Sequence, residues 1–518
     1  MTEETEVTAE PDAQEFKLEE QTELRFEVEA NCKVVIELKS GTAEIFGTEL
    51  VKNKKFNFSS GEKVAVFTWH GCTLELLGKP EVSYIAKETP MVFYANLHGV
   101  LEHMREKAEK EDSKGPIVLI TGPADVGKTT LCRILLNYAV RLNHRPVFVD
   151  LDVELSSVSI PGTIAALPVE RVADVEEGFS STAPLVLHYG HKSPATNIML
   201  YNTLVSKLAA VIDSRSSDIN KKARASGCVI NTGGWVKNEG YLSIKHAAKT
   251  FEANLILVID QERLYNELVR DLATDINIVF VPKSGGVVER SQHARAEAQD
   301  SRIRQYFYGL KTHLYPHSFD VKFSDMKVYK IGAPSLPDSC MPLGMKPEDN
   351  RTKLVPVQNG QNLLHHILSI SYADNLEEEV VSTNVVGFVC VTNINAERQS
   401  VTMLSPQPRP LPKTIFLIGD VHLDDDKREA THRPNLLEKY LLVWMKKYPS
   451  VAEVPKYVKP DLMEKVRNKT RIKLNIYFCI VTAFVCLLMV YSGKKAAERG
   501  ESVRKMNVQW HEEQNAKK

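Results

Sequence analysis

A glycine-bounded loop between an apolar run and a helical pattern constrains the fold of this chain most. The apolar run ends at Thr121, Gly122-Pro-Ala-Asp-Val-Gly-Lys-Thr-Thr130 follows, and apolar residues then recur with helical spacing. This is the G-x-x-x-x-G-K-[ST] pattern in the strand–loop–helix setting that it requires. Loop amides and the positive end of the helix can together hold a polyphosphate. The sequence therefore predicts a P-loop domain that binds a nucleoside triphosphate, with a glycine-rich turn that binds nothing as the alternative.

Four residues of the loop have roles that follow from their chemistry. Gly122 and Gly127 permit backbone angles and a close approach that a Cβ would block. Lys128 would reach the β- and γ-phosphates, and the hydroxyl of Thr129 would bind Mg²⁺. The predicted cofactors are therefore ATP and Mg²⁺.

Composition excludes several classes of protein. The chain of 518 residues is too long for a single core, and its 43% hydrophobic residues can supply several packed interiors. Because 65 basic and 66 acidic side chains leave a net charge of −1, any nucleic-acid contact must come from local patches. The eight cysteines include no C-x-x-C pair, which argues against a zinc site or a secreted disulfide framework and for a reducing compartment.

The residue pattern changes several times along the chain. Residues 1–14 are acidic and are predicted to be disordered. Short alternating strands such as Leu24–Val28 follow, separated by Ser-Gly turn signals, which is typical of a small β-sandwich or barrel. We predict an N-terminal β domain over 15–105, an α/β P-loop domain over 106–310 and a small β-rich C-terminal domain over 311–422.

The α/β region contains five apolar runs without polar alternation. Such runs suit a parallel sheet that is covered on both faces. A nucleotide would then lie at the carboxyl ends of the strands. The runs are Val147–Leu151, Leu185–Tyr189, Cys228–Asn231, Leu255–Ile259 and Ile276–Val281.

The character of the chain changes again after residue 422. A linker and juxtamembrane segment over 423–470 leads to a nearly unbroken apolar run, Leu474–Tyr491, with basic residues on both sides. This density of apolar residues favours membrane insertion. We predict one transmembrane helix over 471–493 and a basic polar tail over 494–518, with a buried soluble helix as the alternative to the span.

Two carboxylates follow the first of the five apolar runs. Asp150 and Asp152 would lie on the same side of an extended strand, so either could hold Mg²⁺ or accept a proton from an attacking hydroxyl. Asp152 is preferred because it lies further toward the active edge. Capping of a helix or turn is the alternative role.

Two further groups could act on a substrate. Trp235 follows an apolar strand beside two glycines, where it could stack on a base, although a single tryptophan can also belong to the core. Arg290 and Arg295 open a basic helix from which both could reach the site and neutralise a migrating phosphoryl group. A solvated charged helix is the alternative.

At these residues the chain resembles a known family, the polyribonucleotide 5'-hydroxyl kinases of the pre-mRNA cleavage/polyadenylation and tRNA-splicing machinery. The resemblance runs from about residue 16 to residue 422 and implies a β domain, a central P-loop kinase and a C-terminal domain. Besides the P-loop, the matching segments are Glu23–Val28, Ala43–Thr48, Val64–Gly71, Ser157–Thr163, Asn231–Lys237, Asp260–Glu267, Pro282–Arg290 and Leu404–Pro412.

The resemblance also implies roles for individual residues. Asp152 would be the catalytic carboxylate and, with Thr129, a metal ligand. Lys128 and the two arginines of the basic helix, Arg290 and Arg295, would be catalytic as well. Substrate contacts would come from Trp235, as a clasp on the RNA end, and from the hydroxyl of Ser193. The nucleotide would be bound by Glu23, Lys63, Gly122, Asp125, Val126, Gly127, Lys128, Thr129 and Thr130.

One departure from the family pattern bears on activity. Relatives usually follow the catalytic aspartate with x-Gly-Gln, but here Glu154-Leu155-Ser156 follows Asp152-Val153. Glu154 adds negative charge where the phosphates already concentrate it, and Leu155 cannot donate or accept a side-chain hydrogen bond. The predicted function is an ATP-dependent polynucleotide 5'-hydroxyl kinase acting on RNA ends. The alternative is an ATP-binding, non-catalytic scaffold of the pre-mRNA cleavage complex.

The resemblance implies partners and a location as well. The predicted partners are RNA with a 5'-hydroxyl end, subunits of the cleavage/polyadenylation factor and the tRNA splicing endonuclease, and the predicted location is the nucleus. From about residue 432 the chain resembles a second family, the single-span growth-and-transformation-dependent proteins, which are often mitochondrial. The matching segments are Glu438–Trp444, Tyr457–Asp461 and Gly493–Ser502. We infer that the chain joins two adjacent genes, either as a read-through product or through an error in the gene model. Any membrane contact would come through this tail. If the tail is genuine, a membrane location, for example mitochondrial, is predicted besides the nucleus, and a membrane-tethered NTPase is a third interpretation.

Overall fold

The computed structural model forms two compact units, Met1–Leu423 and Asp424–Lys518. The structure describes residues 13–29, 32–180, 183–218, 221–272, 274–310, 314–332, 351–358, 361–376 and 379–423 of the first unit. Of the second unit it describes 434–445, 448, 454, 466, 470–471, 473–475, 477–479, 482, 485–486, 489–495 and 503–516.

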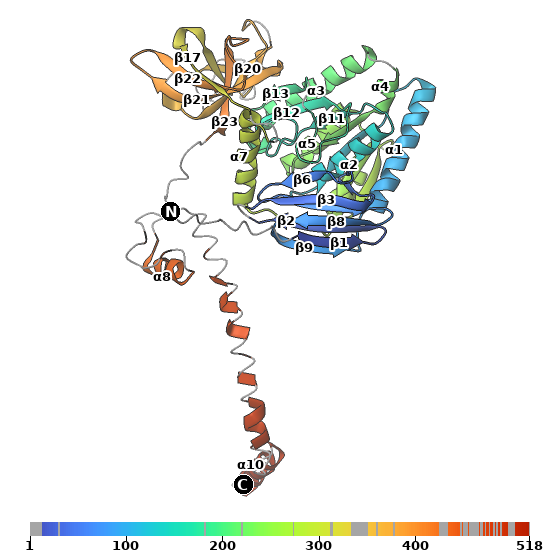
Figure 1. The fold of residues 1–518 in the computed structure, drawn as a ribbon, viewed down its shortest axis with the longest axis vertical. Helices are drawn as coiled ribbons and strands as arrows, with labels where there is room; N and C mark the ends of the chain where they lie inside the picture. Colours follow the sequence, from blue (N-terminus) through green and yellow to red (C-terminus); the bar gives the residue numbers. More distant parts are fainter. Residues whose placement is uncertain are drawn as a thin grey trace, which may run out of the picture. The chain divides into compact units, whose positions relative to one another are not determined.

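The N-terminal domain is a sandwich of two antiparallel sheets, as predicted (Figure 1). One sheet has the strand order β1-β8-β3-β6 and the other β5-β4-β7-β2-β9. Both sheets contribute to one core, in which Phe26 and Phe58 meet edge to face with ring centroids 5.4 Å apart. The strands are β1 (Ala13–Leu18), β2 (Thr22–Val28), β3 (Val34–Gly41), β4 (Glu44–Ile45), β5 (Thr48–Glu49), β6 (Lys55–Phe58), β7 (Lys63–Thr68), β8 (Cys72–Leu77) and β9 (Pro80–Ala86).

The boundaries of this domain differ slightly from the prediction. Strand β1 begins at Ala13, inside the segment 1–14 that was predicted to be disordered, of which residues 1–12 lie outside the described part of the chain. Helix α1 (Met91–Glu111) runs across the predicted boundary at 105/106. It starts directly after Pro90, whose fixed φ and missing amide donor suit the first turn of a helix.

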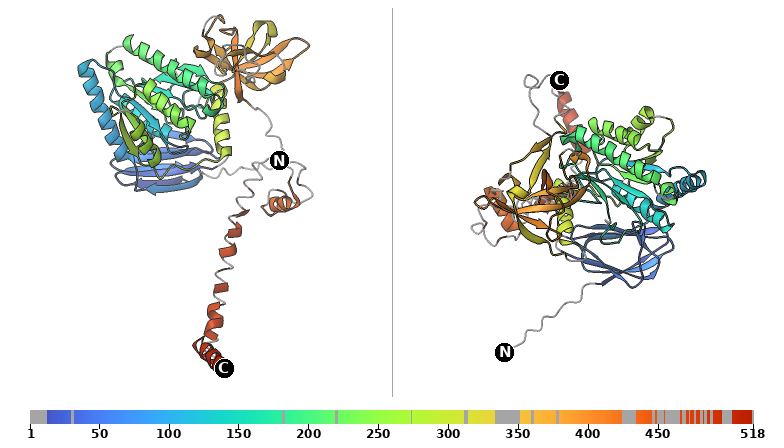
Figure 2. Two further views of the ribbon diagram at one scale, coloured as in Figure 1. Left: turned by 180° about the vertical axis from the view of Figure 1, so that it is seen from behind. Right: turned by 90° about the horizontal axis from the view of Figure 1, so that it is seen from above.

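The central domain has helices on both faces of its sheet (Figure 2). This sheet has seven strands in the order β13-β12-β11-β14-β10-β15-β16. Along β10, Val118 and Ile120 pack with α1, α2 and α7, whereas Leu119 packs with α3, α5 and α6 on the other face. The strands are β10 (Ile117–Thr121), β11 (Val147–Asp150), β12 (Thr163–Pro168), β13 (Leu185–His188), β14 (Cys228–Asn231), β15 (Leu255–Ile259) and β16 (Asn277–Val281). The further helices are α2 (Lys128–Arg141), α3 (Ile198–Asp218), α4 (Lys221–Ser226), α5 (Glu239–Thr250), α6 (Glu262–Asp271) and α7 (Gln292–Tyr308).

The central sheet is mixed, which corrects the prediction of a parallel sheet. Strands β10, β11, β14, β15 and β16 pair in parallel, but β12 runs antiparallel to both of its neighbours. None of the predicted apolar runs includes β12. Its sequence, Thr-Ile-Ala-Ala-Leu-Pro, contains alanine and proline, which are depleted in strands, so its local signal is weak.

The C-terminal domain is β-rich, as expected, and has its own seven-stranded sheet in the order β17-β22-β21-β20-β23-β18-β19. It packs on the central domain, because Phe388 shares a core cluster with Phe307 and Ser369 Oγ lies 2.7 Å from His188 Nδ1. The elements are β17 (His317–Lys322), η2 (Phe323–Asp325), β18 (Lys327–Ile331), β19 (Leu354–Pro356), η5 (Gln361–Leu363), β20 (His366–Ser371), η6 (Val380–Ser382), β21 (Val385–Asn395), β22 (Ser400–Ser405) and β23 (Ile415–His422).

The second unit contains α8 (Leu436–Trp444) and α10 (Val503–Ala516). Asn435 and Glu438 form a capping box at the start of α8, and Leu442, Val454 and Val466 form a small core. Among the residues that the structure describes, no helix combines the length and the apolar character needed to cross a membrane. The predicted span over 471–493 falls partly on residues outside the described ones, so it stays a prediction.

Candidate functional site

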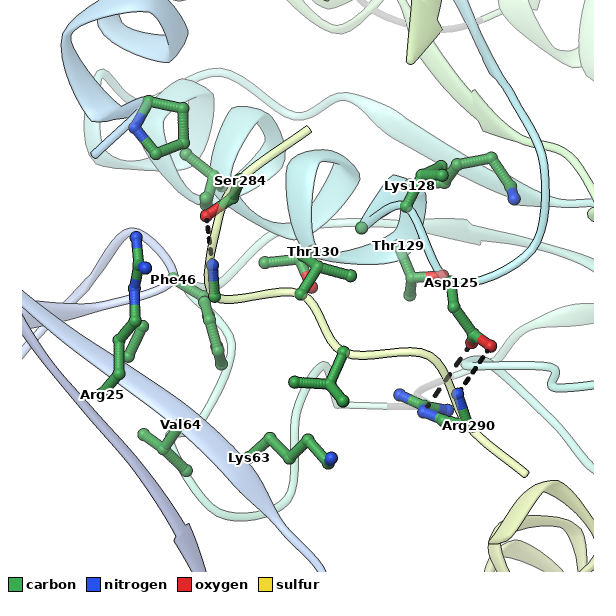
Figure 3. A pocket seen from close by; sticks show the side chains of 18 of the residues that line it. Arg25, Phe46, Lys63, Val64, Asp125, Lys128, Thr129, Thr130, Ser284 and Arg290 are labelled. Carbon is green, nitrogen blue, oxygen red and sulfur yellow. Dashed lines mark hydrogen bonds and ion pairs between the residues drawn. The ribbon is translucent and has the colours of Figure 1, made fainter. Parts of the chain in front are cut away.

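A cavity of about 450 Å³ opens between the N-terminal sandwich and the P-loop (Figure 3). Strands β2, β7 and β9, the P-loop with the start of α2, and the segments after β11 and β16 all contribute to its wall. Most of the predicted site residues therefore lie around one space. Those that line it are Glu23, Lys63, Asp125, Val126, Gly127, Lys128, Thr129, Thr130, Asp152, Arg290 and Arg295.

The two glycines of the P-loop are required by its geometry. Gly127 precedes α2 with a φ of +90°, in the left-handed region that favours glycine. At Gly122, a Cβ would stand 2.6 Å from the carbonyl oxygen of Ile259, so a larger residue would push the loop away from β15. The loop therefore lies tightly between the sheet and the N-terminus of α2, as phosphate binding through loop amides requires.

Lys128, the first residue of α2, is buried and folds back over the loop. Its ammonium donates hydrogen bonds to the carbonyl oxygens of Gly122 at 3.0 Å and Pro123 at 2.6 Å. Burial lowers the pKa of Lys128, and the nearby carboxylate of Asp152 opposes this shift. The ammonium is thus held beside the cavity, where it can exchange these carbonyl contacts for phosphate oxygens.

A buried hydrogen-bond network connects the P-loop with the neighbouring strands. Asn231 Nδ2 lies 3.3 Å from Thr129 Oγ1 and 3.0 Å from Asp150 Oδ1. Asp150 Oδ2 also accepts from the amide of Ser157 at 2.7 Å and from its hydroxyl at 2.6 Å. Arg302 of α7 donates to the carbonyl oxygen of Ser157. Asp150 therefore positions Asn231 and the Ser157 loop, and burial raises its pKa.

Asp152 lines the cavity, whereas Asp150 lies behind it in the network. Asp152 Oδ1 accepts from the amides of Glu154 at 3.0 Å and Leu155 at 3.4 Å, which fixes the carboxylate at the end of β11. Burial, and after it the neighbouring charge of Asp150, raise the pKa of Asp152 to about 6 although Lys128 opposes the shift. A carboxylate with this pKa suits acceptance of a proton from a hydroxyl near neutral pH.

The oxygen donors beside the P-loop fit Mg²⁺. The hydroxyl of Thr129 and the carboxylate of Asp152 both line the cavity, and Mg²⁺ prefers such hard oxygen ligands together with waters and phosphate oxygens. Across the residues that the structure describes, no group of three or more His, Cys, Asp or Glu side chains could hold a metal ion. A Mg²⁺ ion here would therefore depend on the phosphates of a bound nucleotide.

Arg290 and Arg295 meet the P-loop through Asp125. Figure 3 shows Arg290 beside Asp125. Asp125 Oδ2 accepts from the amide of Arg290 at 3.0 Å and from the guanidinium of Arg295 at 2.6 Å. Burial alone would raise the pKa of Asp125, but these bonds and the positive charges lower it. Arg295 also lies 3.9 Å from a carboxylate oxygen of Glu154. Both arginines thus stand at the phosphate end of the cavity, held by carboxylates.

The N-terminal sandwich builds the opposite end of the cavity. Glu23 accepts a hydrogen bond of 2.5 Å from Arg25 Nε, and Lys63 pairs with Glu27 at 2.9 Å. The guanidinium of Arg25 packs on Gly286, where a Cβ would stand 2.8 Å from Nε. Arg25 therefore connects this end of the cavity with the segment that leads into α7.

Three of the predicted site residues are not among the described residues that line the cavity. Gly122 shapes the loop instead. Trp235 follows Gly234, which packs closely on Ala124 of the P-loop: a Cβ added at Gly234 would stand 2.8 Å from the Cα of Ala124. The Trp235 segment therefore lies beside the P-loop. Ser193 Oγ accepts from a backbone amide at 3.4 Å and caps η1 (Pro194–Thr196). The structure thus brings the Trp235 segment to the P-loop but gives Ser193 a capping contact.

The residues that sequence reasoning missed are those that join the parts of the site. Arg25 and Asn231 belong to segments of the family resemblance, but nothing in their spacing indicated the contacts with Gly286 and Thr129. The one available signal was the glycine pair before Arg290, because adjacent glycines often mark a close approach of another group.

Three family profiles match consecutive parts of the first unit. The N-terminal beta-sandwich domain of polyadenylation factor matches residues 17–108, the P-loop of the mRNA cleavage and polyadenylation factor CLP1 matches 122–309, and the pre-mRNA cleavage complex II protein Clp1 matches 314–425. "Protein CLP1 homolog" of Anopheles gambiae is 60% identical over 412 residues, which are 79% of this chain and 97% of that protein. The chain belongs to the Clp1 family.

Other Clp1 proteins extend this comparison. "Polyribonucleotide 5'-hydroxyl-kinase Clp1" of Gallus gallus is 59% identical over 412 residues, 80% of this chain and 97% of that protein. A solved structure that describes the extended interface between Pcf11p and Clp1p, and ATP loss in a point mutant, has a TM-score of 0.70. It is 25% identical and covers 80% of this chain and 99% of that one. A wild-type Clp1p–Pcf11p complex has a TM-score of 0.68 at 25% identity, with the same coverage.

The tail matches a different family, a protein of unknown function (DUF1075), over residues 396–518. This match overlaps the end of the Clp1 region and continues through the second unit. Because that family carries no functional description, the predicted kinship of the tail with growth-and-transformation-dependent proteins stays a prediction.

Proposed function

We propose that this Clp1 protein is an ATP-dependent polynucleotide 5'-hydroxyl kinase that acts on RNA ends. The observation that carries the proposal is the phosphate end of the cavity, where the P-loop, Asp152 and two arginines line one space. A 59% identical relative is named a polyribonucleotide 5'-hydroxyl-kinase, and this chain spans 97% of its length.

The P-loop side would hold and activate ATP. Lys128 and the loop amides would bind the β- and γ-phosphates, and Glu23 and Lys63 of the sandwich would contact the rest of the nucleotide. Thr129 and Asp152 would hold Mg²⁺, which would neutralise phosphate charge when it is bound.

The acceptor side would supply the nucleophile. Asp152 would accept the proton of the 5'-hydroxyl while the oxygen of that hydroxyl bonds to the γ-phosphorus. The bond between the γ-phosphorus and the bridging oxygen to the β-phosphate would break at the same time, which leaves ADP. Arg290 and Arg295 would leave Asp125 and stabilise the charge on the transferred group. Trp235 would stack on the terminal base, and Ser193 would contact the same end of the RNA.

Partners and location follow from the same family. We propose that the protein works in the nucleus with subunits of the cleavage/polyadenylation factor and with the tRNA splicing endonuclease. Support for the first partner comes from the Clp1p–Pcf11p complexes and from the profile of the pre-mRNA cleavage complex II protein, which covers 314–425. Co-purification of both complexes with the tagged full chain, followed by mass spectrometry, tests the two partners separately.

The second candidate function is an ATP-binding scaffold without turnover. Glu154 and Leu155 favour it, because they line the cavity beside Asp152 where relatives usually carry Gly-Gln. In this reading ATP would stabilise the contacts between the sandwich and the P-loop domain, and the arginines would stay on Asp125.

Transfer of the labelled γ-phosphate of ATP to a 5'-hydroxyl oligoribonucleotide separates the two functions. Transfer by the full chain that Lys128→Ala abolishes supports the kinase. ATP binding without transfer, with activity gained in the double variant Glu154→Gly/Leu155→Gln, supports the scaffold.

The tail is proposed to be a separate unit that the Clp1 region does not need. The boundary at residue 424 and the separate family match support this proposal. Sequencing of single transcripts across residues 400–450 tests whether one message encodes both parts. Carbonate extraction of membranes from cells that express the full chain tests the predicted span over 471–493.

A further inference from the structure

Glu154 lies among the groups that would surround the terminal phosphate of a nucleotide. Its side chain lines the cavity beside Asp152, and one carboxylate oxygen is 3.9 Å from the guanidinium of Arg295. The side chain is 38% exposed, so it is not packed into the core. Glu154 is therefore a charged, partly exposed part of the cavity wall, and its ion pair with Arg295 is a long one.

Arg295 is shared between carboxylates of the protein. The hydrogen bond with Asp125 at 2.6 Å is the shorter contact, and Glu154 approaches the other terminal nitrogen. The bond to Asp125 raises the pKa of Arg295, and the charges of Glu154 and Asp152 add to this shift. A phosphate that recruits Arg295 must therefore replace contacts that the protein already provides.

We infer that Glu154 controls how strongly the site distinguishes nucleotides by the charge of their phosphates, and that it reduces the preference of the site for ATP over ADP. Its carboxylate competes with the γ-phosphate for Arg295 and also repels that phosphate. ADP lacks the γ-phosphate, and its own phosphates would stay with the P-loop and Lys128. The inference deepens the proposed function, on which it rests, but it requires only that nucleotides bind.

The local backbone allows a clean test of this charge. The contact that fixes the Asp152 turn is made by the amide of Glu154 at 3.0 Å, not by its side chain. Glu154→Gln therefore removes the charge with the turn retained, whereas Glu154→Asp retains the charge. Glu27→Gln is the matched control, because Glu27 lines the same cavity at the sandwich end and pairs there with Lys63.

The experiment is calorimetric titration of the full chain and the three variants with Mg·ATP and with Mg·ADP. Because the site is partly solvated, the repulsion is weakened but not abolished, and Glu154→Gln should strengthen ATP binding about fivefold and ADP binding less than about twofold. Glu154→Asp should resemble the parent, and Glu27→Gln should change both affinities by the same factor. The gain in ATP binding should shrink at high salt, because screening weakens the repulsion.

An unchanged ratio of ATP to ADP affinity in Glu154→Gln would overturn the inference, and so would weaker ATP binding. If the parent binds both nucleotides, such a result leaves the proposed function intact. If the parent binds neither nucleotide, the proposed function fails and the inference fails with it. If Glu154→Gln does not fold, Glu154→Ala replaces it as the variant without the charge. Equal ratios of ATP to ADP affinity in Glu154→Asp and Glu154→Ala would then overturn the inference.

Discussion

The nucleotide side and the acceptor side of the site are built in different ways. The phosphate-binding loop is one continuous stretch, held by its own glycines and by the bonds of Lys128 to its carbonyl oxygens. The acceptor side takes its groups from separate segments, and of these Trp235 and Ser193 do not line the described cavity. The residues of a continuous motif are thus positioned by local structure, whereas groups from distant segments depend on tertiary packing.

Loss of Lys128 should have the largest effect and should act on the nucleotide side. We expect Lys128→Ala to reduce kcat/KM for phosphate transfer about a thousandfold, because it removes the cation that would bind the β- and γ-phosphates. Calorimetry should show weaker ATP binding in the same variant. Normal ATP affinity together with normal transfer would show that the P-loop does not hold the phosphates.

Asp152 stands between the two sides and should affect chemistry more than binding. We expect Asp152→Asn to reduce transfer about 100-fold, with ATP affinity much less affected. Since the pKa of Asp152 is raised to about 6, the base is increasingly protonated below that pH. The kcat/KM of the parent should therefore rise with pH up to about 6 and then level off. A flat profile between pH 5 and 7 would exclude Asp152 as the base.

Trp235 tests the acceptor side alone. Trp235→Ala should raise the KM for the oligoribonucleotide about tenfold, because one stacked base is lost, and should leave the ATP affinity unchanged. The control is Trp510→Ala in α10 of the tail, which should change neither quantity. An equal loss of ATP and RNA affinity in Trp235→Ala would mean that the residue supports the fold of the P-loop region.

The contact between Arg25 and Gly286 should have a smaller effect. In Gly286→Ala, the new Cβ would stand 2.8 Å from Arg25 Nε, so the guanidinium must shift and its hydrogen bond with Glu23 is disturbed. We expect ATP binding about threefold weaker by calorimetry. Gly99→Ala is the control, since a Cβ there meets no atom within 4 Å, and it should bind ATP as the parent does.

Much of the fold follows from local sequence patterns. The P-loop, the strand runs at Cys228–Asn231 and Leu255–Ile259 and the sandwich were predicted because each has a strong short-range signal. Strand β12 was missed because its two alanines and its terminal proline are depleted in strands and weaken its local signal. Its place in the sheet depends on pairing with β11 and β13, which only tertiary structure reveals.

The candidate site shows the same division. The role of Lys128 follows from a motif, but the bond from Arg295 to Asp125 joins segments that no spacing rule relates. The same holds for Arg302, which reaches the Ser157 loop from α7. Such contacts depend on how the last helix of the central domain packs against the P-loop and the loop after β11, and local patterns do not encode this.

The most direct test of the account compares two RNA ends. The full chain is incubated with γ-labelled ATP and with the same oligoribonucleotide carrying either a 5'-hydroxyl or a 5'-phosphate. We expect label on the 5'-hydroxyl RNA only, and removal of that label by a phosphatase. Label released only as free phosphate, or no label on RNA although ATP binds, would contradict the claim that this cavity presents the γ-phosphate to a 5'-hydroxyl.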